Sequence, residues 1–407
     1  MKTKYSIILA ILFLVVALVS CEKLLPPPLK DEEVLAGTIP GLTLQQEREH
    51  QIGDAAFGKI FTAAEGLGPV FVQTSCSGCH AGNGKGHPSN VVTRFAAVNG
   101  SSVDYLLAKG GPQLQQHCIE NYSAEDLPAE ANVFTKRMAP AIMGLGYIAA
   151  LHDQAILANA DSSDLNGDGI SGRPNYVGPT SFFIPQNIHL PYNNQYIGRF
   201  GKKAEKITIK DQVVFALKQD IGITSNFDMV DLYNYQLGVY TGDKVADPEV
   251  PIDFVNSLVF YMRTLKAPPR RNADDADVLA GEKLFTQIGC VSCHVSTFTT
   301  AESDITALSN QTFHPYSDFL LHDMGVSLDD KYPEGNASSN EWRTPPLWGI
   351  GLAESTQGGL FLMHDGRATS FENAIALHSG EAASRRAAFI ALSDAEKAQL
   401  IKFLKSL

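Results

Sequence analysis

Apolar positions follow a helical period in two stretches of the chain. Between residues 254 and 265 they fall at positions 254, 255, 258, 259, 262 and 265, which is one face of a helix. At the end of the chain, Ser393 and Glu396 form a capping box ahead of apolar residues at 400, 401, 404 and 407. Strand patterns are few and short. The sequence therefore predicts a mainly α fold with long loops, and helices over 254–265 and from Ser393 to the C-terminus.

The N-terminus carries an unbroken apolar run of another kind. Lys2 and Lys4 precede apolar residues 7–18, and Leu18-Val19-Ser20-Cys21 follows. This order is typical of a secretory signal peptide, and the Cys after the cut resembles the lipobox of bacterial lipoproteins. We expect residues 1–20 to be removed and Cys21 to be lipidated, with an ordinary signal peptide or an uncleaved anchor as the alternative. Residues 21–44, with three consecutive prolines, predict a tether.

Lipid on Cys21 would hold the protein to a membrane by the anchor alone, because no later segment is apolar enough to span one. We expect a periplasm-facing bacterial protein, and the outer rather than the inner membrane because Glu22 follows Cys21. The formal net charge of −12 argues against nucleic acid binding and suits a basic redox partner.

Two Cys-x-x-Cys-His motifs carry the clearest chemical signal. Their members are Cys76, Cys79, His80, Cys290, Cys293 and His294. The motif attaches a c-type haem: its thiols bind the porphyrin covalently and its His binds the iron. A zinc site or a disulfide is the alternative, but a His directly after both pairs favours two covalent haem c groups. Of the six cysteines, four would bind haem and Cys21 would carry lipid. The remaining one is Cys118, which we expect to be a buried free thiol.

Segments around the two motifs form a weak repeat. Residues 57–61 (Phe-Gly-Lys-Ile-Phe) and 281–285 (Gly-Glu-Lys-Leu-Phe) precede the motifs, and both predict short amphipathic helices. Downstream, an Arg-x-x-Pro segment leads to Gly-x-Gly, first from Arg137 and then from Arg343. The simplest account is two related cytochrome c-like haem domains in tandem. We place them at 45–268, with an insertion, and at 269–407.

One loop in the insertion resembles the first half of a calcium-binding loop. Its candidate ligands are Asp164, Asn166, Asp168 and Ile170. The twelfth position holds Asn175 instead of the usual Glu. One bound calcium ion is the prediction, and an Asx-rich turn without an ion is the alternative.

Several segments together resemble a known family. Residues 343–349, the His364-Asp365-Gly366-Arg367-Ala368 turn and residues 378–382 look like the peroxidase-like di-haem oxidoreductases, also called thiol oxidoreductase-like cytochromes. These are relatives of bacterial di-haem cytochrome c peroxidases and of MauG. Segments 168–173, 198–201 and 321–325 match as well. The resemblance covers residues 45–407. Its motifs are specific to the family but not to one reaction.

The resemblance implies a ligand set for the second haem. In di-haem peroxidases, a Met fourteen residues after the His-Asp-Gly turn is the sixth ligand of the C-terminal haem, and here that position is His378. We expect His294 and His378 to bind one iron, a pair that gives a lower potential than a thioether ligand. A surface role for His378 is the alternative. The resemblance also implies that His364 and Arg367 contact a propionate or order nearby water, whereas we expect His322 to be a core residue.

The sequence does not decide the sixth ligand of the first haem. Candidate sixth ligands are His87, His117, Met138 and Met143, and an open position is the further alternative. An iron with a vacant sixth position could bind peroxide. Cleavage of the oxygen–oxygen bond is then helped by a nearby acid–base group that moves a proton between the oxygens. Relatives use Glu or Gln, and the weak candidates here are Glu130, Glu125 and His87.

We therefore predict a di-haem c-type cytochrome oxidoreductase that transfers electrons and reduces hydrogen peroxide at its N-terminal haem. The alternative is a pure electron-transfer cytochrome with both haems six-coordinate and no substrate. The expected partner is a small redox donor protein, such as a cytochrome or a cupredoxin. A reaction on thiols is disfavoured, because the sequence has no pair of cysteines left free to carry it out. Trp342 and Trp348 are candidates either to pass electrons or to pack the core.

Overall fold

The structure is a computed structural model that describes residues 30, 34–238 and 242–407. The predicted signal peptide, Cys21 and most of the predicted tether lie outside these residues. Within the described part of the chain, no helix has both the length and the apolar character needed to cross a membrane.

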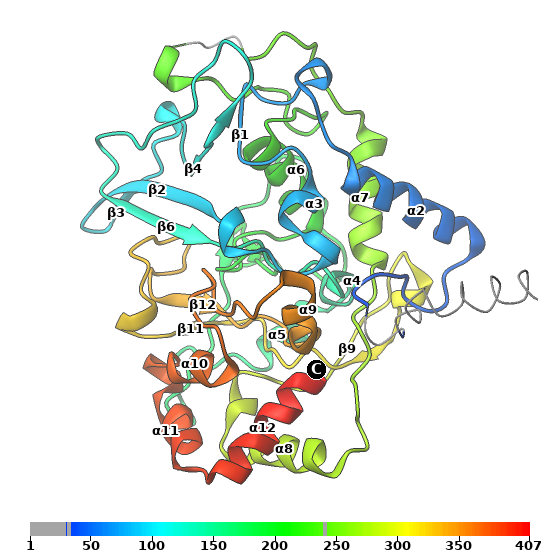
Figure 1. Ribbon diagram of the computed structural model, residues 1–407, viewed down its shortest axis with the longest axis vertical. Coiled ribbons are helices and arrows are strands. Elements are labelled where there is room, and N and C mark those ends of the chain that lie inside the picture. The colour runs from blue at the N-terminus through cyan, green and yellow to red at the C-terminus, as the bar shows by residue number, and fades with distance from the viewer. Residues whose placement is uncertain (1–29, 31–33, 239–241) are drawn as a thin grey trace, which may run out of the picture.

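Helices supply the longest elements of the fold (Figure 1). Four of them are α2 (Leu44–Gly58), α7 (Ile252–Thr264), α8 (Ala276–Gln287) and α12 (Asp394–Ser406). Helix α7 confirms the periodicity between 254 and 265, and α12 begins at the predicted capping box of Ser393 and Glu396. The shorter helices are α3 (Cys76–Cys79), α4 (Leu145–Ala149), α5 (Asp153–Leu157), α6 (Ile209–Ala216), α9 (Ala353–Gln357), α10 (Phe371–Ala376) and α11 (Ala383–Ala391).

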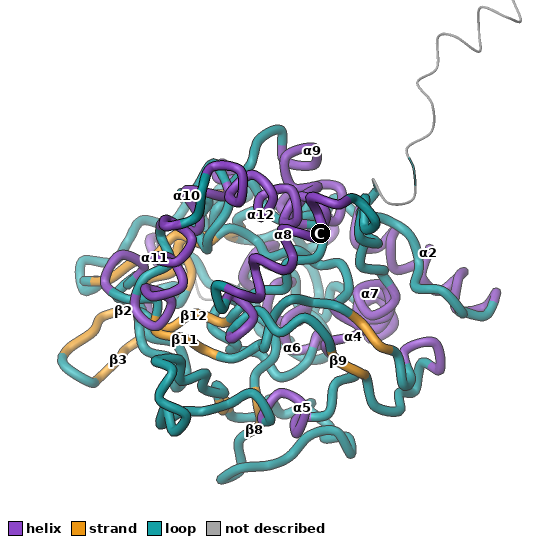
Figure 2. The backbone as a smooth tube through the Cα atoms, turned by 90° about the horizontal axis from the view of Figure 1, so that it is seen from below, coloured by secondary structure: helices purple, strands orange, loops and turns teal. Residues whose placement is uncertain are grey.

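Strands are more numerous than the sequence predicts, so the fold is mixed and the expectation of a mainly α fold needs correction. Strand β2 (Val92–Asn99) pairs antiparallel with β3 (Ser102–Asp104), β4 (Gln113–Leu114) and β6 (Val133–Arg137). The remaining strands form two-stranded pairs: β1 (Val70–Phe71) with β5 (His117–Cys118), β7 (Tyr176–Val177) with β8 (Tyr196–Ile197), β9 (Phe298–Thr299) with β10 (Thr312–Phe313), and β11 (Leu321–Asp323) with β12 (Glu341–Arg343). Long loops connect them (Figure 2).

Two pairs of crossed helices frame the molecule. Helix α2 packs on α7 toward one end, and α8 packs on α12 at the other (Figure 1). A glycine permits each close approach. A Cβ on Gly53 would lie 2.3 Å from the carbonyl oxygen of Ser257, and a Cβ on Gly281 would lie 2.1 Å from that of Gln399. Both values are far below van der Waals contact, so these positions need glycine.

The Gly-x-Gly segments repeat in the same structural role. Gly144 and Gly349 have left-handed φ angles of 71° and 72° and precede α4 and the turn at Ile350–Leu352. Gly146 and Gly351, two residues on, each lie against a backbone carbonyl near the C-terminal end of α7 or α12. The two halves thus share a set of equivalent contacts, which the weak sequence repeat had indicated.

The repeat nevertheless has a different register from the one suggested by residues 57–61 and 281–285. Helix α2 ends at Gly58, so residues 59–61 are not helical. The equivalent residues are Gly53 with Gly281 and Phe57 with Phe285. The sequence hides this because residues 59–75 separate α2 from the first motif, whereas α8 runs almost directly into the second.

The buried core does not divide cleanly between the halves. One apolar cluster is built from residues 35–262 together with residues near the second motif, including Phe298, Phe319 and Trp348. Another contains only residues after 277 and joins α8 to α12. The proposed boundary at 268/269 stays a prediction, since the two halves share a core.

Candidate functional site

Each Cys-x-x-Cys-His motif forms one tight turn. The first is α3, which is capped by the Ser75 hydroxyl accepting from the Gly78 amide at 3.1 Å. The second is a 3-10 turn at Cys290–Ser292. In both, the amide of the His donates to the carbonyl of the first Cys at 3.0 Å. This turn places both thiols and the following imidazole on one side of a short segment.

The surroundings of the four motif thiols disfavour ionisation. The described cysteines form no disulfide, and the two Cys pairs do not meet in one cluster of metal ligands among the described residues. Burial raises the pKa of Cys76, Cys79 and Cys290 to about 12, and raises that of Cys293. Zinc sites and redox-active thiols instead need a stabilised thiolate. The surroundings therefore disfavour both alternatives and suit thioether attachment to an apolar group.

One cavity of about 440 Å³ is lined by both motifs. Its walls are mainly apolar and include Leu258 and Met262 near the first motif, and Leu400 and Leu404 near the second. Trp342 and Trp348 also line it, with their indole N–H groups donating to the carbonyls of Leu328 and Met143. An enclosed apolar space with few convergent polar groups is the expected form of a cofactor site.

Two histidines face each other across this cavity at the second motif. The ring centres of His294 and His378 lie 6.5 Å apart. Two imidazoles on opposite sides of one metal ion, with metal–nitrogen bonds of about 2 Å, place their centres about 6 Å apart. Each Nδ1 lies 2.8 Å from a backbone carbonyl, that of Tyr316 for His294 and that of Ala374 for His378. These bonds leave both Nε2 atoms free for one metal.

The protonation of this pair also suits metal binding. Burial lowers the pKa of His294 to about 4 and lowers that of His378. Both rings are therefore neutral at physiological pH, which a ligating imidazole must be. Phe285 of α8 lies 5.9 Å from the ring centre of His294 and supports it from the side.

The first motif has the same support but no second imidazole. Phe57 of α2 lies 5.9 Å from the ring centre of His80, matching Phe285 and His294. Burial lowers the pKa of His80 to about 4. Its Nδ1 makes no hydrogen bond of good geometry, although backbone groups of Gly84 and Pro140 lie close enough to raise that pKa slightly. In the described part of the chain, no histidine faces His80 as His378 faces His294.

Three cations beside the cavity have no carboxylate partner. Lys85 donates to the carbonyls of Phe361 and Met363 at 3.2 and 3.0 Å, and Arg343 donates to that of Gly201 at 2.9 Å. The side chain of Lys202 makes no hydrogen bond or ion pair within the described residues, whereas its carbonyl accepts from the Arg343 amide at 3.0 Å. Burial and the neighbouring charges of Lys85 and Arg343 hold the pKa of Lys202 well below its usual range.

Buried cations at a mainly apolar cavity suit an anionic ligand, and Glu205 on the cavity wall offsets only part of the charge of Lys202 and Arg343. Burying a cation costs free energy that an opposite charge recovers. Haem carries two propionates on an otherwise apolar plane, so the cations, the apolar walls and the paired imidazoles together fit haem groups. Thioether attachment at the four thiols would fix their edges.

Comparison with known proteins decides the family. The profile described as "Di-haem oxidoreductase, putative peroxidase" matches residues 117–407. The chain belongs to this family. Its matched part includes the second motif, His378 and the His364 turn, while the first motif lies before it. The di-haem oxidoreductase assignment and the presence of haem therefore hold, as the sequence resemblance implied.

Two solved structures show weak overall similarity. Hydrazine synthase of Kuenenia stuttgartiensis has 15% sequence identity and a TM-score of 0.36, covering 94% of this chain and 96% of that chain. A MauG-like protein associated with microbial copper homeostasis has 16% identity and a TM-score of 0.30, covering 71% of this chain and 94% of its own. No curated protein sequence matches.

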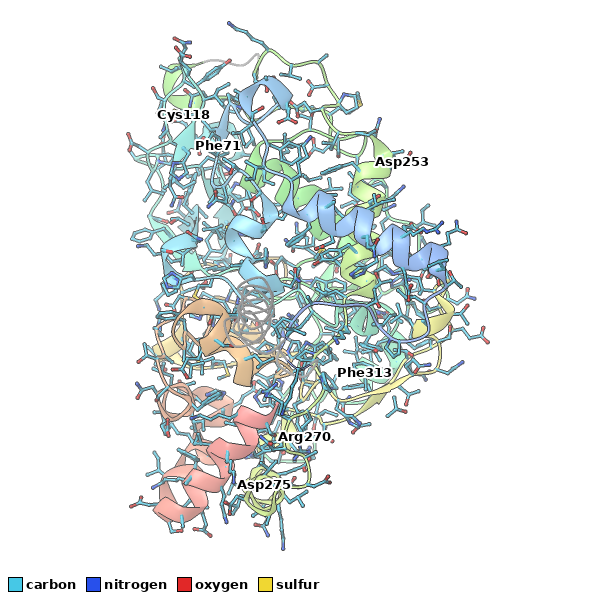
Figure 3. All side chains as sticks on the ribbon, turned by 45° about the vertical axis from the view of Figure 1, so that its right-hand side comes forward. Phe71, Cys118, Asp253, Arg270, Asp275 and Phe313 are labelled. Atoms are coloured by element: carbon cyan, nitrogen blue, oxygen red, sulfur yellow. The ribbon has the colours of Figure 1, made fainter. Side chains whose placement is uncertain are left out.

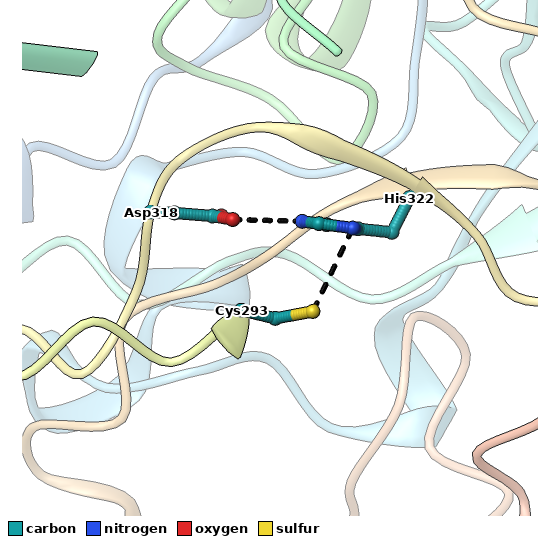
Figure 4. Close-up of side chains that lie close together, drawn as sticks. All are labelled: Cys293, Asp318 and His322. Atoms are coloured by element: carbon teal, nitrogen blue, oxygen red, sulfur yellow. Dashed lines mark hydrogen bonds and ion pairs between the residues drawn. The ribbon is translucent and has the colours of Figure 1, made fainter. Parts of the chain in front are cut away.

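His322 is a satisfied core residue in this di-haem oxidoreductase. Its Nε2 lies 2.7 Å from Asp318 and its Nδ1 lies 2.8 Å from Glu381, while the Cys293 sulfur is 3.6 Å away (Figure 4). Burial opposes a charge on the ring, but the hydrogen bonds to Asp318, Cys293 and Glu381 outweigh it and raise the pKa of His322 to about 12. An imidazolium has no lone pair for iron, so His322 positions Cys293 instead.

The His364 turn separates its two predicted residues. His364 lines the cavity and stacks on Trp342, with ring centres 3.8 Å apart. Burial lowers the pKa of His364 to about 3. Arg367 does not line the cavity. It bonds Asp365 and donates to the carbonyl of Ser327 at 3.0 Å. Of the two, only His364 is placed to contact a haem directly.

The sequence candidates for proton transfer lie away from the cavity. Glu130 is exposed and pairs with Lys109 at 2.8 Å. Glu125 is buried, and its carboxylate accepts from the Gln115 amide at 2.9 Å. Burial raises the pKa of Glu125 to about 8, but it does not line the cavity. His87 is hydrogen-bonded to Ser89 at 2.7 Å and also lies outside the lining.

The candidate sixth ligands of the first haem divide in the same way. Met138 and Met143 are fully buried and line the cavity, whereas His117 does not. His117 and Cys118 belong to β5, which pairs with β1, and Figure 3 shows Cys118 beside Phe71 at the end of the molecule remote from Arg270 and Asp275. The Cys118 thiol donates to the carbonyl of Tyr122 at 3.2 Å and is half-buried.

The predicted calcium loop already uses its oxygens. Both carboxylate oxygens of Asp164 accept from the Gly169 amide, Asn166 accepts from the Asp168 amide, and Asp168 pairs with Arg385 at 3.1 Å. Such bonds are those of an Asx-rich turn. Calcium binding at this loop stays a prediction.

Two polar residues at the first motif escaped sequence analysis. Gln113 and Asp220 both line the cavity, and the Gln113 amide donates to the Asp220 carboxylate at 2.6 Å. Burial raises the pKa of Asp220, whose charge in turn influences Cys76 and Cys79. No motif marks either residue, and a long stretch of sequence separates them. Lys202 was missed as well, although the adjoining 198–201 segment gave a signal nearby.

Proposed function

We propose that this di-haem oxidoreductase binds two covalent haem c groups with different ligation. The turns at residues 76–80 and 290–294 would supply the thioether bonds and the proximal imidazoles. His378 would complete an imidazole pair at the second haem, a low-potential and coordinatively closed arrangement suited to electron transfer. The observation that carries this proposal is the asymmetry between the two motifs: His294 faces a second imidazole at 6.5 Å and His80 faces none among the described residues.

The first haem is then the site where a substrate can bind iron. An iron with a free axial position binds and reduces peroxide. Reduction of hydrogen peroxide to two waters breaks the oxygen–oxygen bond and consumes two electrons and two protons. We propose that the electrons come from a small redox donor protein and enter through the second haem. Trp342 and Trp348, which line the shared cavity, lie along the route between the motifs.

Asp220 is the residue best placed to handle the protons. Its carboxyl lines the cavity close to the first pair of cysteines, and its raised pKa brings proton release and uptake nearer to neutral pH. Gln113 holds one carboxylate oxygen through its amide at 2.6 Å, which orients the carboxyl. Asp220 thereby takes the role that the sequence had offered to Glu130, Glu125 or His87.

A pure electron-transfer cytochrome is the second candidate, and one observation favours it. Met138 and Met143 line the cavity, and a thioether from either could close the first haem. Both sulfurs are otherwise packed beside glycines, Met138 against Gly366 and Met143 against Gly349. Either Met would have to leave this packing to bind iron.

We also propose that the protein faces the periplasm and is held to the outer membrane by lipid on Cys21. Support comes from the sequence of the signal peptide and from covalent haem attachment, which takes place outside the bacterial cytoplasm. The acidic surface suits a basic donor protein.

Low-temperature electron paramagnetic resonance of the holoprotein tests the proposal. We expect one high-spin and one low-spin ferric signal, with peroxide abolishing the high-spin signal in the fully oxidised or the one-electron-reduced protein. Asp220→Asn should lower the rate of peroxide reduction by about 10²-fold or more while leaving both signals in place. Glu130→Gln, which changes an exposed carboxylate, is the matched control and should be unaffected. Two low-spin signals that ignore peroxide in both redox states would establish the electron-transfer cytochrome instead.

A further inference from the structure

A second polar site lies outside the cavity, in the loop between α6 and α7. Carboxylate oxygens of Asp231, Asp247 and Glu249 lie within 4.8 Å of one another. The carboxyl of Asp243 adjoins that of Glu249 and acts on Asp231 as well. Three carboxylates thus converge, with a fourth, that of Asp243, beside Glu249. None of them forms an ion pair with a described Lys or Arg.

Several oxygens of this cluster are buried without a donor. Asp243 is only 7% exposed, and its Oδ2 has no hydrogen-bond partner. Oδ1 of Asp231 and Oε1 of Glu249 are also buried and unpartnered. Buried carboxylate oxygens rarely stay unsatisfied, because desolvation without a partner costs about 1–3 kcal/mol or more. The arrangement therefore points to a missing positive partner.

The opposite oxygens of the same carboxylates are held in place. Thr224 donates its amide to Glu249 Oε2 at 2.5 Å and its hydroxyl to both Glu249 and Asp247. The Asp243 amide donates to Asp231 Oδ2 at 3.2 Å. Each carboxylate is thus oriented by a donor on one side and presents a free oxygen on the other. Lys218, the nearest cation acting on Asp231, is bound to Asp228 at 2.8 Å.

We infer that Asp231, Asp243, Asp247 and Glu249 form a calcium-binding site. The donor set contains oxygen only, with no His or Cys, which selects a hard cation. Ligand oxygens of Asp231, Asp247 and Glu249 are close enough together for a single ion to contact all three at about 2.4 Å. Irregular loop ligands suit calcium better than magnesium, which demands a near-octahedral shell. Asp247 is exposed and provides an entry path.

The site is physically tied to the first haem region, although its existence does not depend on the proposed reaction. Thr224 follows the turn Leu217–Ile221, whose Asp220 lines the cavity. The Glu249 carboxyl also packs directly against Gly66. An ion here would fasten the end of this turn to the chain that leads toward the first motif.

The predicted loop at 164–170 provides a matched comparison. Its carboxylates already accept backbone amides or pair with Arg385, whereas those of the cluster keep free oxygens. Asp231→Asn and Asp164→Asn each remove one carboxylate charge from a different candidate site. Glu249→Gln adds a variant that keeps an oxygen for the Thr224 donors if Asp231→Asn does not fold.

The test uses the full holoprotein after removal of metal with a chelator. Calorimetric titration with calcium chloride should show one ion per chain, with binding weakened about 10-fold or more by Asp231→Asn or Glu249→Gln and unchanged by Asp164→Asn. The inference is overturned if the wild-type protein binds no calcium, if Asp164→Asn abolishes binding while Asp231→Asn keeps it, or if magnesium binds more tightly than calcium.

Discussion

Replacing the glycine at either helix crossing should damage one haem region and spare the other. Gly281→Ala puts a methyl group where the α8–α12 crossing leaves 2.1 Å to the Gln399 carbonyl oxygen, and Gly53→Ala does the same at 2.3 Å from that of Ser257. Because Phe285 and Phe57 lie on the same helices and contact the proximal histidines, a shift of α8 or α2 reaches the ligand. Gly281→Ala should therefore disturb only the second haem, and Gly53→Ala only the first.

The size of the effect follows from the contact. An ordinary carbon–oxygen contact is about 3.3 Å, so the helices must separate by about 1 Å. Overpacking of this kind costs about 1–3 kcal/mol, and more where backbone meets backbone. The higher helix propensity of alanine stabilises a helix interior by about 1 kcal/mol relative to glycine and offsets part of this cost. We expect a net loss of about 2 kcal/mol in the free energy of unfolding for each variant.

Urea unfolding of the holoprotein, followed at the Soret band and by circular dichroism, measures this loss. Gly58→Ala is the matched control: it lies at the end of the same helix as Gly53, and a Cβ there meets nothing within 4 Å. It should be neutral or slightly stabilising. If Gly53→Ala or Gly281→Ala proves as stable as Gly58→Ala, or if both variants disturb the same haem, the proposed equivalence of the two crossings is wrong.

Other perturbations follow from the same geometry. His378→Ala removes one of two facing imidazoles, so the low-spin ferric signal of the second haem should turn high-spin; an unchanged signal would show that another residue binds there. Lys202→Met removes a side chain whose charged form acts on His80. Because positive charge favours the reduced haem, the potential of the first haem should fall in a redox titration below the depressed pKa of Lys202, and that of the second haem should hold. Burial opposes ionisation of Glu334, but the charges of Arg94 and Arg137 outweigh it and hold its pKa at about 2. The ionised Glu334 therefore contributes its full stabilisation above the unfolded pKa of about 4.3, and this stabilisation is lost as the pH falls from about 4 to 2. Urea unfolding at several pH values measures the effect. The free energy of unfolding should depend less on acid pH in Glu334→Gln than in the wild type.

Periodicity located the helices of this protein but not its strands. Helices α7 and α12 carry their apolar face and caps within a dozen or so residues, so the signal is local. Strands such as β7 and β8 are two residues long and are defined by a partner elsewhere in the chain. No alternating pattern can develop over such a length, and the fold consequently looked more helical than it is. The Arg-x-x-Pro and Gly-x-Gly segments also lie close together in the sequence, so the repeat was visible there. The residues ahead of the two motifs were aligned wrongly, because the loop that connects the helix to the motif is longer at the first motif than at the second.

The same contrast explains why the family resemblance predicts a ligand pair for the second haem but leaves the sixth ligand of the first haem open. His378 follows α10 by two residues, and its orienting bond goes to the Ala374 carbonyl of that helix, so one short element carries both the ligand and its support. At the first motif, Gln113 comes from β4 and Asp220 from the turn after α6, and only the packed cavity brings them to 2.6 Å. Residues that are far apart in the sequence have no characteristic spacing, so a function that depends on such a pair cannot be predicted from a motif. In the proposed function, the haem that would exchange a ligand for substrate is therefore the one whose surroundings the fold, rather than any motif, defines.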